Sequence, residues 1–396
     1  MSLAKRLDRI DEPQTIKMAK LSRELKAQGI NVVDLSLGEP DFATPEHIQY
    51  AAVIAMKDGY TKYPPVAGFP ELRQAVVDKF KRDNDLDYAL ENVMVCTGAK
   101  QCIANVMMCL LDDGDEVVIP SPYWVTYGDL VKVCGGNVVE VKATLEQDFK
   151  INAAQLAAAI TPKTKAFIFS SPCNPTGSVY TMQELESLCE VFKKYPEIIV
   201  ISDEIYEYIN FEGKHASIAH VPSMQARTVV INGLSKAYAM TGWRLGYMAG
   251  PVHLIKACET MQSQFTSGPN SITQRAAIVA LNGTLEPAMQ MVEAFKERRN
   301  FLVKALNAIP GVKANNPPGA FYVFPDVSSF FGKKNGDITI NNSLELCMYL
   351  LHTANVSCVT GDAFGDGNCI RISYATSMEN LVEAMKRIEK ALMALQ

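Results

Sequence analysis

One lysine of the chain, Lys236, stands between two apolar segments. The residues before it, 229–232, are mostly apolar and β-branched, which predicts a buried strand, and a second apolar run covers 245–249. Lysine is rarely buried without a task, and burial lowers its pKa because the charged ammonium loses its hydration. A neutral amine is a nucleophile that attacks aldehydes, and pyridoxal phosphate (PLP) is an aldehyde of this kind. The alternative is an ordinary surface loop with a solvated Lys236.

Arg244 and the segment 97–100 offer binding groups for a phosphate. The guanidinium of Arg244 is suited to a phosphate group. Thr97-Gly98-Ala99-Lys100 follows a predicted strand and opens a predicted helix, where glycine lets the backbone approach a ligand and free amides bind phosphate. Lys100 opposes the dipole at the start of this helix, which favours an anionic ligand as compensation. The alternative is a routine turn between a strand and a helix.

Polar side chains also follow two further predicted strands. Asp203 lies at a strand end, where its carboxylate could keep a pyridine nitrogen protonated. Tyr206 and Asn174, the latter fixed between two prolines, could donate hydrogen bonds to the phenolic oxygen of the same cofactor. The alternatives are a helix N-cap for Asp203 and a β-turn around Asn174.

Trp124 and Arg371 complete the candidate site. Trp124 follows a predicted strand and is suited to stacking on a ring, although core packing is the usual fate of an aromatic side chain. Arg371 lies inside an apolar strand, 369–373, and a buried guanidinium needs an anion, for which a carboxylate has the matching planar shape. The alternative for Arg371 is an internal salt bridge.

The elements that position these residues alternate between strand and helix. Strands alternating with helices from residue 93 to 249 predict a mainly parallel sheet between helices, with ligands beyond the carboxyl ends of the strands. Among the other elements we predict a helix over 70–84, and another over 45–58 with Thr44 as its N-cap. The expected fold class is α/β: a large domain over 45–285, and a smaller α+β domain from 1–44 and 286–396.

Composition limits the class of protein. The chain has 396 residues, of which 48% are hydrophobic and 20% charged, as in a globular protein. A net charge of −5 argues against nucleic acid and against an anionic membrane as partners. The ten cysteines show no C-x-x-C pair, so we expect neither disulfides nor a bound metal. The first residues lack the apolar core of a secretory signal, and no apolar run has the length of a membrane span, so we expect a cytoplasmic protein.

Several motifs together resemble the class I/II aminotransferases of the PLP-dependent fold type I superfamily, over essentially the whole chain. The most specific are Ser171-Pro172-Cys173-Asn174-Pro175-Thr176-Gly177, the segment 202–206 (Ser-Asp-Glu-Ile-Tyr) and the segment 235–246 around Lys236. Within this family the chain is most similar to the bacterial-type (subgroup Ib) aspartate aminotransferases. That similarity rests on the segments 36–42, 63–68, 98–101 and 122–124.

The resemblance implies a role for each matching residue. Lys236 would be the lysine that bonds covalently to PLP and moves the substrate proton, and Asp203 would pair with the pyridine nitrogen. Asn174 and Tyr206 would bond the phenolic oxygen, and Trp124 would stack on the ring.

The phosphate would be held by Gly98, Ala99, Ser235 and Arg244. Many relatives carry a phosphate-binding serine where this chain has Gly233, which leaves more of that contact to Ser235 and Arg244. Tyr63 matches a tyrosine that reaches the phosphate of the neighbouring subunit, so a homodimer with active sites at the subunit interface is implied.

The resemblance also indicates the substrates, an amino acid and a 2-oxo acid. Arg371, with the backbone of Gly38, would bind the α-carboxylate, next to Asn174 and Trp124. Lys100 is the candidate for the second carboxylate of a dicarboxylic substrate, and Thr15 is expected to assist. We therefore expect amino-group transfer from L-aspartate to 2-oxoglutarate. Relatives that also aminate prephenate tend to carry a basic residue near position 11, but the segment 10–13 is acidic here, so weak prephenate activity is expected.

Other functions stay open from the residues alone. The same fold serves aromatic and alanine aminotransferases and PLP-dependent β-lyases, and fold does not settle the reaction. A PLP-binding regulator without turnover is a more distant alternative, because such proteins usually carry an additional DNA-binding domain and this chain shows no basic patch. A nicotinamide-binding protein is disfavoured by the lack of G-x-G-x-x-G after the first strand.

Overall fold

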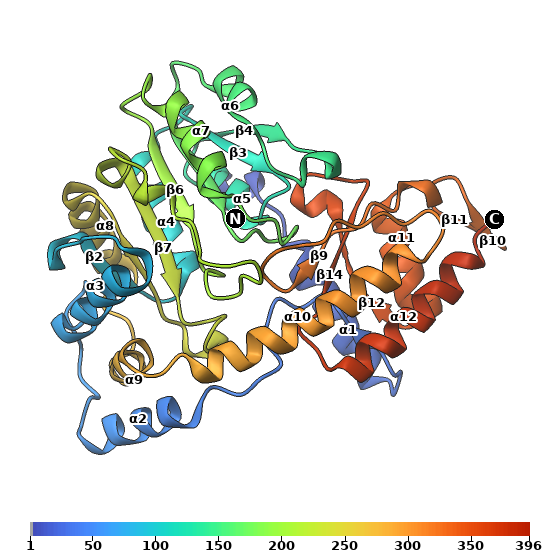
Figure 1. Ribbon diagram of the computed structural model, residues 1–396, viewed down its shortest axis with the longest axis horizontal. Coiled ribbons are helices and arrows are strands. Elements are labelled where there is room, and N and C mark those ends of the chain that lie inside the picture. Colours follow the sequence, from blue (N-terminus) through green and yellow to red (C-terminus); the bar gives the residue numbers. More distant parts are fainter. Residues whose placement is uncertain (1–2) are drawn as a thin grey trace.

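The computed structural model describes residues 3–396 and is built around a seven-stranded sheet (Figure 1). In spatial order the strands are β2 (Val93–Cys96), β8 (Gly246–Ala249), β7 (Thr228–Gly233), β6 (Ile199–Asp203), β5 (Thr164–Ser170), β3 (Glu116–Ser121) and β4 (Asn137–Lys142). All neighbouring strands are parallel except where β8 runs antiparallel to β2 and β7. The prediction of a mainly parallel sheet is confirmed.

Helices cover both faces of this sheet because its central strands are apolar on both sides. On one face α4 (Ala99–Leu110), α5 (Thr126–Val133) and α8 (Val252–Phe265) contribute to a buried core with Val117 and Ile168. On the other face α6 (Ala153–Ala159) and α7 (Met182–Phe192) contribute to a core with Val118 and Phe167. Consecutive strand residues therefore point to opposite cores, as the two-residue period of a strand requires. The remaining helices of this part are α2 (Glu46–Lys57), α3 (Pro70–Asn84) and α9 (Ser271–Asn282).

The chain termini and tail form a second, smaller part beside the sheet (Figure 1). Its strands are β1 (Val33–Asp34), β9 (Tyr322–Val323), β10 (Lys334–Asn335), β11 (Ile338–Thr339), β12 (Val356–Ser357), β13 (Val359–Thr360) and β14 (Ile370–Ser373). Its helices are α1 (Gln14–Ala27), α10 (Glu286–Asn307), α11 (Ser343–Tyr349) and α12 (Met378–Met393). β1 pairs with β12, which joins the N-terminal segment to the tail, and β14 lies between β13 and β9. α10 runs from the large sheet part into this smaller part (Figure 1).

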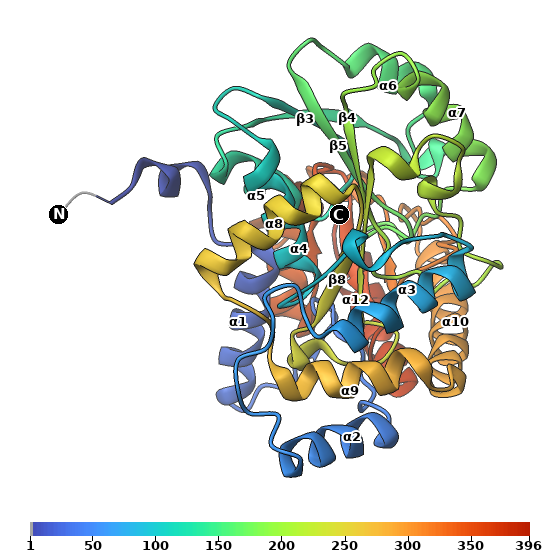
Figure 2. The ribbon, with the colours of Figure 1, turned by 90° about the vertical axis from the view of Figure 1, so that its left-hand side faces the viewer.

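The two parts meet where functional side chains are expected. Strands β2, β3, β5, β6 and β7 are mutually parallel, so their carboxyl ends lie at one edge of the sheet. Ligands of open α/β sheets bind at this edge. The N-terminal η1 (Lys5–Arg9) projects from the body of the molecule (Figure 2).

One predicted helix start is wrong. The helix expected over 45–58 is α2, but the structure places its N-cap at Pro45, with no side-chain cap. The Thr44 hydroxyl donates instead to the carbonyl oxygen of Ala239, 2.8 Å away. The hydroxyl that was expected to cap α2 therefore makes a tertiary contact.

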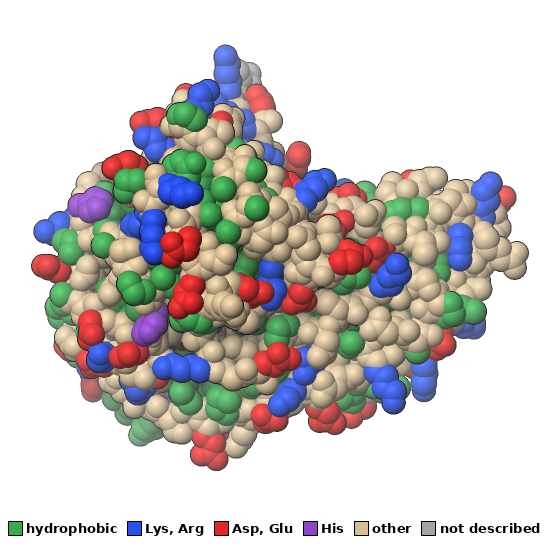
Figure 3. Space-filling view, turned by 45° about the horizontal axis from the view of Figure 1, so that its top comes forward, with side chains coloured by type: hydrophobic (Ala, Val, Ile, Leu, Met, Phe, Trp, Pro, Cys, Tyr) green, Lys and Arg blue, Asp and Glu red, His purple; other side chains and the backbone are tan. Residues whose placement is uncertain are grey.

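The surface carries charges of both signs. In the face shown in Figure 3, acidic and basic side chains are interspersed. Among residues 3–396, no helix is both long and apolar enough to span a bilayer.

Candidate active site

A cavity of about 540 Å³ lies at the carboxyl edge of the sheet, against the smaller part. It brings together most of the residues singled out from the sequence: Thr15, Gly38, Ala99, Lys100, Trp124, Asn174, Asp203, Tyr206, Ser235, Lys236, Arg244 and Arg371. Gly98 is not part of the lining but directly precedes Ala99 at the start of α4. Tyr63 is not part of it either, and its side chain is 94% exposed.

Lys236 follows β7 and points into the cavity. Its Nζ donates a hydrogen bond to the carbonyl oxygen of Gly38. Burial, helped by the charge of Arg371, lowers the pKa of Lys236 to about 8, although Glu39 and Asp203 act in the opposite direction. The amine is therefore closer to its nucleophilic form than a solvated lysine would be.

Asp203 ends β6 and is buried, with an exposed fraction of 3%. Its Oδ2 accepts a hydrogen bond from the Tyr127 hydroxyl at 2.6 Å, and its Oδ1 accepts one from the backbone N–H of Ile205 at 3.2 Å. Burial raises the pKa of Asp203 to about 6, although these two hydrogen bonds lower it. Among residues 3–396, no cation forms an ion pair with this carboxylate, so it lacks a positive partner.

Arg371 lies on β14 and is also buried, at 2% exposure. Its Nη1 donates to Oδ1 of Asn174 at 3.0 Å, and its Nη2 donates to the carbonyl oxygen of Ser36 at 2.6 Å. Its Nε is buried and has no hydrogen-bond partner within the described chain. Among the described residues no carboxylate forms an ion pair with Arg371, so the internal salt bridge that the sequence left open is not formed and this donor is free for an anion.

The start of α4 forms a cradle with Arg244. Gly98 has φ 87°, and a Cβ atom at this position would lie 2.3 Å from Nη2 of Arg244. Glycine is thus required both by the backbone conformation and by the close approach of the guanidinium. The first amides of α4 and Arg244 converge on the cavity, which is the arrangement that binds a phosphate.

Lys100 lies on the first turn of α4, with its Nζ 5.0 Å from the centre of the Trp124 ring. Burial and the nearby charge of Arg244 lower the pKa of Lys100. The cavity therefore collects the positive charges of Lys100, Arg244 and Arg371, an arrangement suited to a ligand with several negative charges.

Sequence reasoning missed Tyr322, Tyr127 and Arg23, which also line the cavity. The hydroxyl of Tyr322 lies 2.8 Å from that of Tyr206, and its ring covers the guanidinium of Arg371 at 4.6 Å. Tyr322 sits on the short strand β9 amid apolar residues, so only the tertiary fold brings it to the site. Tyr127 comes three residues after Trp124, but Trp124 precedes α5, so no helical spacing indicated it.

The sequence matches the family model for aminotransferase class I and II over residues 30–388. The chain belongs to this family. Among curated class I and II aminotransferases, it is 46% identical to the aspartate/prephenate aminotransferase of Nitrosomonas europaea, covering 99% of this chain and 100% of the relative. It is 45% identical to the aspartate aminotransferase of Geobacillus stearothermophilus, covering 98% of each.

Solved aminotransferase structures have the same fold. The aspartate aminotransferase from Rhizobium meliloti matches with a TM-score of 0.97 and 42% identity, covering 100% of both chains. The Thermus thermophilus enzyme with maleate matches with a TM-score of 0.92 and 40% identity, covering 99% of this chain and 100% of that one. The predicted family, fold class and amino-group transfer are confirmed, and the chain is a PLP-dependent transferase.

The geometry of the cavity fits PLP. The buried carboxylate of Asp203 lacks a cation, which a protonated pyridine nitrogen would supply. The cradle of Gly98 and Arg244 suits its phosphate, and the amine of Lys236 suits its aldehyde.

Proposed function

We propose that this aminotransferase moves the amino group of L-aspartate to 2-oxoglutarate. The observation that carries the proposal is the pair of cations in one cavity with Lys236: Arg371, whose Nε has no partner, and Lys100 on α4. Two cations suit a substrate with two carboxylates. The relatives named as aspartate aminotransferases support this choice, as does the Thermus thermophilus enzyme, which was solved with maleate, a four-carbon dicarboxylate.

In this proposal the residues of the cavity divide between cofactor and substrate. Asp203 pairs with the pyridine nitrogen, Asn174 and Tyr206 bond the phenolic oxygen, and Trp124 stacks on the ring. The phosphate is held by Gly98, Ala99, Ser235 and Arg244. Arg371 and Gly38 hold the α-carboxylate of the substrate, with Asn174 and Trp124 beside it, while Lys100 and Thr15 contact the distal carboxylate.

Lys236 both carries the cofactor and moves the proton. Bound PLP supplies an electron sink that acidifies the Cα–H bond of the amino acid. With a pKa near 8, the Nζ of Lys236 can accept that proton and return it, as a general acid and base should at physiological pH. The Gly38 carbonyl oxygen orients the same Nζ, so the loop that borders the substrate also positions the proton carrier.

Prephenate should be a poor acceptor. The relative from Nitrosomonas europaea is named for prephenate as well as aspartate. In this chain Asp11 and Glu12, both exposed, directly precede Pro13, which lines the cavity. Relatives that aminate prephenate tend to carry a basic residue near position 11, and the acidic side chains at this rim supply no such cation, so weak prephenate activity is expected.

The active form is proposed to be a homodimer whose sites lie at the subunit interface. Tyr63 is 94% exposed and lies outside its own cavity, and α2 leaves Tyr50 and Met56 exposed at 65% and 51%. These large exposed side chains are available for contact with a second copy of the chain. We also propose a large domain over 45–285 and a small one from 1–44 and 286–396, and a cytoplasmic location, which the ten free cysteines support.

An absorbance experiment tests the proposed function. Protein loaded with PLP should show a visible band, lose it with aspartate and regain it with 2-oxoglutarate. Loss of the band only with alanine or an aromatic amino acid would contradict the dicarboxylic preference. Release of pyruvate and ammonia instead of glutamate would indicate a β-lyase, and a band that no amino acid changes would indicate a regulator.

A further inference from the structure

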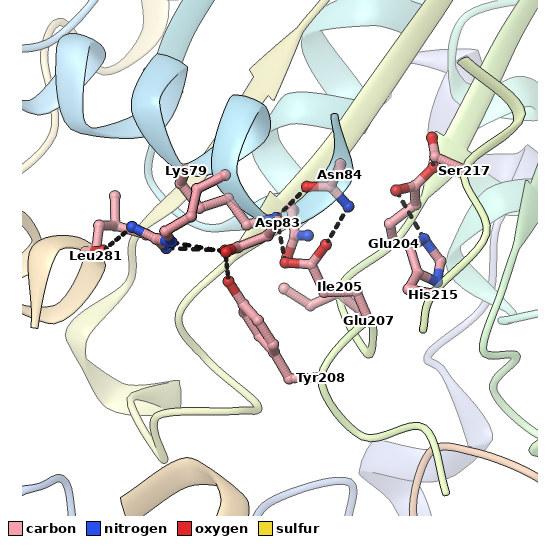
Figure 4. Close-up of polar contacts among 12 residues, drawn as sticks. Lys79, Asp83, Asn84, Glu204, Ile205, Glu207, Tyr208, His215, Ser217 and Leu281 are labelled. Atoms are coloured by element: carbon pink, nitrogen blue, oxygen red, sulfur yellow. Dashed lines mark hydrogen bonds and ion pairs between the residues drawn. The ribbon is translucent and has the colours of Figure 1, made fainter. Parts of the chain in front are cut away.

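The segment 203–207, at the end of β6 and in the turn after it, directs its acidic side chains to two different sides. Asp203 and Tyr206 line the cavity, whereas Glu204 and Glu207 are buried behind it, at 1% and 4% exposure. Figure 4 shows this rear side, where Glu204 meets His215 and Glu207 lies near Asn84. Buried carboxylates are costly unless paired, so each needs a compensating group.

Glu204 is held by three side chains. Its Oε1 accepts hydrogen bonds from the hydroxyls of Ser202 at 2.9 Å and Ser217 at 2.7 Å. Its Oε2 lies 2.8 Å from Nε2 of His215. The other ring nitrogen of His215, Nδ1, is buried without a hydrogen-bond partner in the described chain, so Glu204 is the polar partner of this ring.

The second carboxylate has a cation of its own. Glu207 forms a buried ion pair with Lys79 of α3 and accepts a hydrogen bond from Asn84 at 3.0 Å. Single ligand atoms of Glu204, Glu207 and His215 lie within 4.8 Å of one another, a spacing that a metal ion could use. However, the Lys79 ammonium already occupies the Glu207 carboxylate, so we interpret the cluster as two ion pairs.

We propose that His215 is a positioning residue for the cofactor site, which acts through Glu204 to hold Asp203 in place with its negative charge. This inference rests on the proposed pairing of Asp203 with PLP. The chain of contacts is short: His215 binds Glu204, and Glu204 is joined to Asp203 by one peptide bond.

The electrostatics of the cluster agree with this role. Burial lowers the pKa of His215, but the charge and hydrogen bond of Glu204 outweigh it, so the net shift is upward and favours the imidazolium. Glu207 and Lys79 are the other charged groups that act on this ring. The negative charge of Glu204 raises the pKa of Asp203. His215 acts on Glu204 in turn, because its hydrogen bond and its charge both stabilise the Glu204 carboxylate. Loss of the imidazolium would leave the charge of Glu204 unbalanced and favour protonated, neutral Asp203.

The first test uses the unmodified protein. Histidine-labelled apoprotein gives NMR signals for its five histidines, assigned by single substitutions. We expect the His215 ring to stay protonated to a higher pH than an ordinary imidazole, and its signals to shift when PLP binds. A His215 ring whose pKa lies at or below the ordinary imidazole value of about 6.5 would overturn the proposal, and the titration itself is recorded on the unmodified protein.

The second test measures the dissociation constant of PLP against pH in His215→Gln, Glu204→Gln and the double variant. PLP affinity is expected to fall at acidic pH, and His215→Gln should move this fall to higher pH by about one unit. At a given acidic pH the variant would then bind PLP about tenfold more weakly. Glu204→Gln should move the same limb to lower pH, because it removes the negative charge next to Asp203. The double variant should return toward the wild-type position. A purely structural defect would not shift the limb in opposite directions.

Matched controls separate this inference from the proposed function. His220→Gln, in the same segment but exposed, should leave the PLP affinity unchanged. If Asp203→Asn weakens PLP binding but His215→Gln binds as tightly as His220→Gln at every pH, the inference on His215 fails alone. If Asp203→Asn binds PLP like the wild type, the proposed role of Asp203 fails first.

Discussion

Nη1 of Arg371 donates a hydrogen bond to Oδ1 of Asn174 across 3.0 Å, which joins β14 in the tail to the loop after β5. The same guanidinium reaches the carbonyl oxygen of Ser36, so three distant segments meet at one side chain. Asn174 is also the residue proposed to bond the phenolic oxygen of PLP. A substrate carboxylate bound to Arg371 would therefore share that guanidinium with Asn174, the residue proposed to contact PLP.

Substitution Arg371→Lys should lower kcat/KM for aspartate by about 100-fold or more. A single ammonium would replace the planar guanidinium that binds Asn174 and Ser36 and is proposed to bind the substrate carboxylate as well. Steady-state kinetics measures this loss, and PLP titration should show the cofactor still bound. The matched control is Arg387→Lys on α12, whose guanidinium pairs with Glu383 at the surface. Equal losses in both variants would contradict the assignment of Arg371 to the substrate.

Lys100→Ala should change specificity rather than abolish turnover. The variant removes the cation proposed for the distal carboxylate, so kcat/KM for aspartate should fall by about 10- to 100-fold, as expected for one lost charge-assisted contact. Activity on alanine or phenylalanine, which lack that carboxylate, should stay within about twofold. Lys132→Ala, at an exposed lysine of α5, is the control. An equal loss with all amino acids would remove Lys100 as the specificity residue.

PLP affinity should fall as the pH drops through about 6. Burial raises the pKa of Asp203 to about 6 in the protein without cofactor, and only the ionised carboxylate can pair with a protonated pyridine. Below this pH the carboxyl group holds a proton that PLP binding must displace, so each further pH unit should cost about tenfold in affinity. Fluorescence titration at several pH values measures the effect. In Asp203→Asn, affinity should be weaker at neutral pH and this limb should be absent.

The regular elements were predictable where local signals agree. The helix over 70–84 was predicted with the bounds that α3 has, because Pro70 opens it and the αL residue Asp85, with φ 54°, ends it. Helices α5 and α8 were missed. Their N-cap residues are Val125 and Pro251, and neither caps through its side chain, so the side-chain capping signal was absent.

The site was predictable only where its residues lie in compact motifs. Lys236 and Arg244 belong to one segment, and Asp203 and Tyr206 to another, so their spacing carries information. The contact between Tyr206 and Tyr322 spans 116 positions of the chain, and nothing in the local pattern indicates it. Contacts of this kind, which set orientation and pKa, depend on how the tail docks on the sheet.

The exposed Tyr63 makes a mixing experiment decisive for the proposed interface. If Tyr63 serves the partner's site, a dimer of one Lys236→Ala chain and one Tyr63→Ala chain contains one intact site, because the lysine and the tyrosine then come from different chains. Random exchange of the two inactive or weakened variants should restore about a quarter of the wild-type activity, as expected for a symmetric dimer.

The control for this experiment mixes Lys236→Ala with Arg371→Ala. Both residues line the cavity of the same chain, so every site in that mixture lacks one of them and no activity should return. Light scattering with size-exclusion chromatography measures the mass of each mixture. If Tyr63→Ala and Lys236→Ala form mixed dimers without recovering activity, Tyr63 acts within its own chain or not at all. A monomeric mass would contradict the interface itself, because an exposed Tyr63 would then have no partner's phosphate to reach.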